Sequence, residues 1–154
     1  MQRYVPMTPE QKTLVQDSFA LIAPDADRAG LLFYDRLFQL DPRLRTLFHG
    51  DMGAQSRKLM HILAIAIKGL DDLEAIVPAV RSLGRRHTAY GVTENDFETV
   101  GAALLWTLEH GLGDAFNAQV REAWVTVYGV LAKTMQSGMQ QARSELDRPA
   151  AAAA

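Results

Sequence analysis

The chain has 154 residues, a length that suits a single domain with enough buried surface for a hydrophobic core. Its charge is nearly balanced, with 16 basic and 18 acidic residues, which gives no reason to expect a nucleic-acid partner. Because it contains no cysteine, disulfides, thiolate catalysis, iron–sulfur clusters and cysteine-ligated zinc are all excluded.

Residues 1–7 lack the apolar core of a signal peptide, and we interpret them as an N-terminal extension. No apolar run approaches the roughly 18 residues of a membrane span, so we expect a cytoplasmic protein without a membrane partner. We expect one domain over residues 8–146. Residues 147–154, which end in five alanines, are interpreted as a disordered tail or a cloning remnant.

Helical signals follow one another through this domain, beginning with the capping box Thr8-Pro9-Glu10-Gln11. Capping residues, prolines and glycines divide it into helices expected at about 9–22, 25–40, 42–48, 54–68, 72–90, 94–110 and 118–146. Pro78 is a candidate interruption of the helix at 72–90. Sustained alternation of apolar and polar residues is absent, so the pattern predicts an all-α protein.

His87 is the most informative of the four histidines, because it lies near the end of a helical, mostly apolar segment. A neutral imidazole held by its own helix can bind a metal or a haem iron. The other three, His49, His61 and His110, are expected in a loop, on a surface and at a helix end. No spacing of histidines and acids resembles a zinc site.

In the helix expected at 54–68, Gln55, Lys58, Leu59 and Ile62 fall within about 100° of one another. Such a face either lines a cavity or is a core face with solvated polar neighbours. Tyr34 is expected to point inward, where its hydroxyl needs a partner. That partner is either a backbone carbonyl in an ordinary core or a group in a pocket.

Together these segments resemble the globin family across about residues 8–142. The resemblance rests on Asp41-Pro42 with Leu47-Phe48, Gln55-Ser56-Arg57-Lys58-Leu59-Met60, Leu83-Gly84-Arg85-Arg86-His87, and Ala123-Trp124 with Tyr128-Gly129. The sequence is most similar to bacterial single-domain globins related to neuroglobin and to the haem domain of flavohaemoglobins. This resemblance implies the globin fold, a three-over-three helical sandwich around haem b.

The resemblance also assigns roles to single positions. His87 matches the proximal iron ligand, and Gln55, thirty-two residues earlier, matches the distal position often held by histidine. Tyr34 matches the residue of the second helix that lies over the distal pocket. The positions matched to haem contacts are Phe48, Lys58, Leu59, Arg86, Val92, Phe97 and Val100. Of these, Lys58 and Arg86 are candidates for a haem propionate. The Nδ1–H of His87 is expected to bond the carbonyl of Leu83, one turn back.

The implied function is binding of dioxygen, nitric oxide or carbon monoxide, with the Tyr34 hydroxyl and the Gln55 amide as hydrogen-bond donors to dioxygen. Two alternatives use the same site: a nitric oxide dioxygenase served by a separate reductase, and a gas or redox sensor. The sequence leaves the oligomeric state open.

This chain departs from its relatives at several of the matched positions. Gln55 is a poor iron ligand, so bis-histidine coordination is not expected, and Lys58 or Tyr34 is a hypothetical ligand of ferric iron. Phe97 and Met139 stand where flavohaemoglobins carry a tyrosine and a glutamate. Without that anionic network, peroxidase-like chemistry is the least expected outcome.

Overall fold

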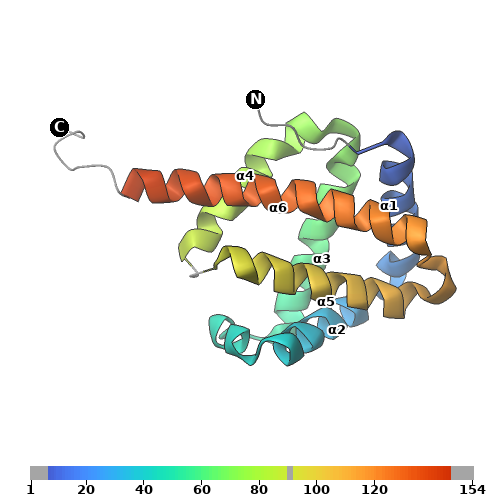
Figure 1. Cartoon of the computed structure of the whole chain (residues 1–154). Coiled ribbons are helices and arrows are strands. Elements are labelled where there is room, and N and C mark those ends of the chain that lie inside the picture. Colours follow the sequence, from blue (N-terminus) through green and yellow to red (C-terminus); the bar gives the residue numbers. More distant parts are fainter. Residues whose placement is uncertain (1–6, 90–91, 147–154) are drawn as a thin grey trace.

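The computed structural model describes residues 7–89 and 92–146, and these ranges consist of helices and their connections without a strand (Figure 1). The α-helices are α1 (Pro9–Ile22), α2 (Ala26–Leu40), α3 (Met52–Lys68), α4 (Leu73–Ala89), α5 (Glu94–Leu112) and α6 (Ala118–Leu146). Short 3-10 helices join several of them: η1 (Ala23–Asp25), η2 (Pro42–Leu47), η3 (Gly69–Asp72) and η4 (Gly113–Ala115). The predicted all-α class is therefore confirmed.

The helix starts follow the polar residues that the sequence places before them. Thr8 accepts a hydrogen bond from the backbone of Gln11, whose side chain bonds back to Thr8, so the capping box is formed. Asn117 likewise accepts from the backbone N–H of Val120 at the start of α6. At the end of α5, Gly113 adopts a positive φ of 56°, a backbone conformation that glycine tolerates best.

The observed elements differ from the predicted ones at several points. The segment expected as a helix at 42–48 is the 3-10 helix η2, and α3 begins at Met52 because the Asp51 carboxylate accepts the N–H of Gly53. Helix α4 continues through Pro78 without a break. A proline removes only one bond of the helical ladder, and α4 as a whole packs extensively against α6. The predicted end of this helix at Tyr90 lies outside the described residues.

The helices pack in a pattern that leaves α4 supported from one side. Helices α5 and α6 lie next to each other, α2 packs against both α3 and α5, and α1 packs against α6 (Figure 1). Among the described residues, α4 makes its extensive contacts with α6 and η3 rather than with α3 or α5. The position of α4 therefore depends mainly on its packing against α6.

The core lies where α1, α2, α5 and α6 converge. Trp124 is its largest fully buried side chain, and the indole Nε1–H donates to the Ser18 hydroxyl at 2.9 Å. No helix in the described ranges is both long and apolar enough to cross a bilayer. Apart from Met7, which packs partly buried against the core, the predicted extension and the predicted tail lie outside the described residues.

Candidate functional site

A close crossing of α2 and α3 brings together two of the predicted site residues. A Cβ added to Gly30 would lie 2.8 Å from the Cβ of Ser56 and 3.0 Å from its carbonyl oxygen, so only glycine permits this approach. Tyr34 follows Gly30 by one turn, and Gln55 immediately precedes Ser56. The Gln55 Nε2 donates to the Tyr34 hydroxyl at 3.1 Å. The crossing therefore joins residues that are 21 positions apart in the sequence.

Tyr34 is buried, with 5% of its surface exposed. Burial raises the pKa of its phenol above 10.0, and the bond from Gln55 offsets only part of this rise. The hydroxyl is therefore protonated at neutral pH. Because its oxygen accepts the Gln55 N–H, its own proton can be donated to a further acceptor. The pair forms a short donor chain running from Gln55 through Tyr34.

Two phenylalanine rings pack against the ring of Tyr34. The centroid of the Phe48 ring lies 5.2 Å from that of Tyr34 in an edge-on arrangement, and the centroid of the Phe38 ring lies 6.0 Å from that of Tyr34 and 5.6 Å from that of Phe48. These separations are typical of favourable aromatic pairs. The three rings are inclined to one another and form an apolar cluster with a single hydroxyl, that of Tyr34.

His87 projects from the C-terminal part of α4 and is held by its own helix. Its Nδ1 lies 2.7 Å from the carbonyl oxygen of Leu83, which confirms the predicted bond. Since a carbonyl can only accept, Nδ1 carries the proton in the neutral ring and Nε2 carries the lone pair. Burial lowers the pKa of His87 below 6.5, and the positive charge of Arg86 lowers it further, although the bond to Leu83 opposes this. The imidazole is therefore neutral at pH 7 and suited to bind a metal through Nε2.

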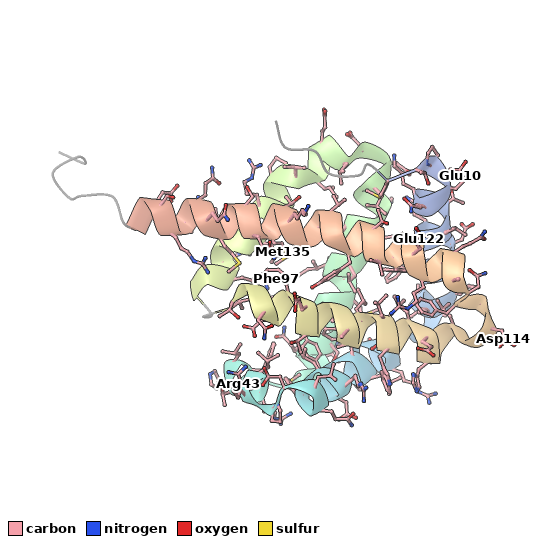
Figure 2. All side chains as sticks on the ribbon, in the orientation of Figure 1. Glu10, Arg43, Phe97, Asp114, Glu122 and Met135 are labelled. Atoms are coloured by element: carbon pink, nitrogen blue, oxygen red, sulfur yellow. The ribbon has the colours of Figure 1, made fainter. Side chains whose placement is uncertain are left out.

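An apolar cluster occupies the junction of α5 and α6. Phe97, Ala132 and Met139 are buried together, and Val92 packs against them partly buried. Met135 also contacts the cluster, facing Phe97 across the two helices (Figure 2). Phe97 and Met139, the two positions that the resemblance matched to a tyrosine and a glutamate, thus share one buried cluster, and their side chains supply only carbon and sulfur atoms there.

The remaining predicted residues fall into two groups. Leu59 and Val100 are partly buried against the main core, as contacts of an interior ligand should be. Lys58 and Arg86 are exposed. Gln55 and Leu59 are thus partly buried on α3 while Lys58 reaches solvent, so for Lys58 the structure agrees with the alternative of a core face with solvated polar neighbours.

Two further contacts involve side chains that were not among the predicted site residues. Phe38 shares the helix face of Tyr34, as its four-residue spacing predicts, and its ring packs against that of Tyr34. The Tyr128 hydroxyl donates to the carbonyl of Phe97 at 2.6 Å, and burial raises the pKa of this phenol. No local signal in the sequence indicated that contact, because its partners are 31 residues apart.

The site chemistry suits an iron porphyrin better than a metal held by protein groups alone. In the part of the chain that the structure describes, no group of three or more histidines, acids or cysteines could hold a metal ion. A porphyrin supplies four nitrogen ligands itself, so it needs only one neutral imidazole, apolar walls and a donor for its ligand. In this chain, His87 has the chemistry of the imidazole, Phe38 and Phe48 supply apolar rings, and the Gln55–Tyr34 pair has a donor hydroxyl.

Comparison with known proteins supports this interpretation. The family model described as Globin matches residues 31–135, more than half of the chain. The chain belongs to the globin family. This globin is similar to neuroglobin of Chaenocephalus aceratus and to neuroglobin of Danio rerio, with 32% identity to each over 146 residues, covering 86% of this chain and 92% of each relative. Neuroglobin-1 of Oncorhynchus mykiss is 29% identical over the same coverage.

Family membership carries two general conclusions. The all-α arrangement of this globin is the globin fold, as the resemblance predicted. Globins generally bind haem and, through it, diatomic gases, so this chain belongs to a haem-binding and gas-binding family.

Proposed function

We propose that this globin binds haem b through the Nε2 of His87 and holds dioxygen, with nitric oxide and carbon monoxide as further ligands, on the opposite face of the haem. The haem supplies the iron at which the gas binds. The chain supplies a neutral imidazole, the aromatic ring of Phe48 against the haem plane, and a hydrogen-bond donor for the gas. The exposed side chains of Lys58 and Arg86 are suited to reach the propionates at the solvent edge.

The observation that carries the proposal is the hydrogen bond from Gln55 to the Tyr34 hydroxyl. Dioxygen accepts electron density from iron, so its outer oxygen favours a donor, whereas carbon monoxide gains little from one. Tyr34 is protonated and buried, and Gln55 orients its oxygen so that the hydroxyl proton points to another acceptor. This arrangement selects dioxygen and slows its release.

Three features support an iron whose sixth position stays open for a gas. Gln55 replaces the histidine that could occupy it, and an amide is a weak iron ligand. The raised pKa of Tyr34 keeps the phenol protonated, which disfavours its binding to ferric iron. Lys58 is exposed and hydrated. An electron paramagnetic resonance spectrum of the ferric protein should therefore show aquo haem.

Absorption spectroscopy tests the cofactor. The purified protein supplemented with haem should show a Soret band, and His87→Ala should abolish the five-coordinate ferrous spectrum. His61→Ala is the matched control, because His61 is an exposed histidine of α3 and its loss should leave the spectrum unchanged. Absence of a Soret band in the wild-type protein would contradict the proposal.

A second candidate function, nitric oxide dioxygenase, is supported by the same donor pair, which would hold dioxygen long enough to meet nitric oxide. It requires a separate reductase. Rapid mixing of the oxygenated protein with nitric oxide should then yield nitrate, and a physiological electron donor should sustain repeated turnover. If no such donor re-reduces the protein, gas binding or sensing remains and the enzymatic function is rejected.

A further inference from the structure

Helices α4 and α6 meet backbone to backbone at two glycines. A Cβ added to Gly84 would overlap the carbonyl oxygen of Met135 and lie 2.7 Å from its carbonyl carbon. A Cβ added to Gly138 would overlap the carbonyl oxygen of Arg81 and lie 2.9 Å from its carbonyl carbon. The atoms in the way belong to the backbone, so no change of side-chain rotamer can relieve either collision.

The two contacts are reciprocal. Each helix contributes one glycine and one carbonyl, and the two groups are three residues apart on both: Arg81 and Gly84 on α4, Met135 and Gly138 on α6. One such contact would limit how closely the helices approach. Two contacts also fix their position along the axis, because sliding would move a carbonyl from a glycine onto a neighbouring side chain.

His87 follows Gly84 by three residues, which is about 4.5 Å along the helix axis. The bond from its Nδ1 to the Leu83 carbonyl ties the ring to the same turn. Among the described residues, the most extensive packing of α4 is against α6. The position of the imidazole therefore follows the α4–α6 spacing.

We propose that Gly84 and Gly138 are positioning residues that set where the His87 imidazole meets the haem iron. This inference rests on the proposed function, because it requires His87 to be the iron ligand. Both glycines act through the distance between α4 and α6, because the atoms nearest to each belong to the other helix.

The size of the effect follows from the contacts. A methyl group needs about 3.4 Å from its neighbours, so an alanine at either position must part the two backbones by on the order of 1 Å. At 100° per residue, His87 projects about 60° from Gly84 and about 120° from Arg81. A shift of α4 away from α6 thus carries the imidazole mainly sideways, which tilts its lone pair off the iron.

Resonance Raman spectroscopy of the ferrous, haem-loaded protein measures this directly through the stretching frequency of the bond between iron and histidine. Gly84→Ala and Gly138→Ala should each lower this frequency, although they lie on different helices. Gly129→Ala is the matched control, because it also lies within α6 and an added Cβ there meets nothing within 4 Å. Its frequency should equal that of the wild type.

Urea unfolding of the same variants separates positioning from stability. Lower stability with an unchanged frequency in both Gly84→Ala and Gly138→Ala would overturn the inference. The Raman band arises only from haem-loaded molecules, so a small folded fraction is sufficient.

A further variant, Glu145→Gln, weakens the exposed ion pair in which Arg85 donates to Glu145 at 3.0 Å across the same helices. If the glycine contacts set the spacing of α4 and α6, the iron–histidine frequency of Glu145→Gln should equal that of the wild type. A shifted frequency would mean that the ion pair sets this spacing instead.

The wild-type spectrum distinguishes failure of the proposed function from failure of the positioning inference. If the wild type shows no iron–histidine band, or if His87→Ala retains it, the proposed function fails. If the wild-type band is present and depends on His87 but neither glycine variant shifts it, only the positioning inference fails.

Discussion

Replacing Tyr34 with phenylalanine removes one hydroxyl while the ring stays packed by Phe38 and Phe48. A hydrogen bond to a charged acceptor contributes about 1.5–3 kcal/mol. Since about 1.4 kcal/mol corresponds to a factor of ten, loss of this bond should raise the dioxygen dissociation rate roughly 10- to 100-fold. Carbon monoxide dissociation should change much less, because that ligand carries little negative charge.

The assay is rapid mixing of the oxygenated ferrous protein with excess carbon monoxide, followed through the change in the Soret band. Tyr128→Phe is the matched control, because it also removes a largely buried tyrosine hydroxyl, but one that donates to the Phe97 carbonyl and not to the Gln55–Tyr34 pair. Its dioxygen dissociation rate should stay close to that of the wild type. If Tyr34→Phe leaves the rate unchanged, the Tyr34 hydroxyl does not donate to the gas and the reasoning is refuted.

The same assay tests whether Gln55 acts on dioxygen release through the Tyr34 hydroxyl. If Gln55 acts by orienting the Tyr34 hydroxyl, Gln55→Leu should accelerate dioxygen release in the wild type but have little effect in the Tyr34→Phe background. Independent donation by the two side chains would instead make their effects multiply. Multiplicative effects would therefore contradict the chain and favour two separate bonds to the ligand.

Three more predictions concern stability, each measured as the free energy of unfolding in urea. Thr8→Ala removes the cap of α1 and should cost about 1 kcal/mol, whereas Thr8→Ser should retain most of it. Trp124→Phe removes the buried bond to Ser18 and leaves unfilled volume, so a loss of about 1–3 kcal/mol is expected; an unchanged value would mean that the core repacks. Because burial raises the pKa of Tyr34 and Tyr128, the unfolded chain loses these protons first as pH rises above about 10. Stability should therefore fall with pH in that range, and Tyr34→Phe should reduce the slope; an equal slope would show that Tyr34 does not contribute.

Much of the site could be predicted because its signals are local. The bond from His87 to the Leu83 carbonyl joins residues four positions apart on one helix, so helix geometry alone predicts it. The inward orientation of Tyr34 follows from its shared face with Leu37, and both are buried. The exposure of Lys58 was one of two alternatives that the sequence left open, because a helical wheel gives the direction of a side chain but not what packs against it.

The sequence by itself determined the all-α class, most helix starts, the neutral histidine within its own helical turn and the membership of the globin family. These depend on interactions between residues within a few positions of one another, or on a pattern of residues along the chain. Only the tertiary structure decided that Gln55 donates to Tyr34, which requires the crossing of α2 and α3 at Gly30. It alone also decided that Gly84 and Gly138 press α4 and α6 together, since the backbone contacts that require these glycines exist only once the two helices have packed.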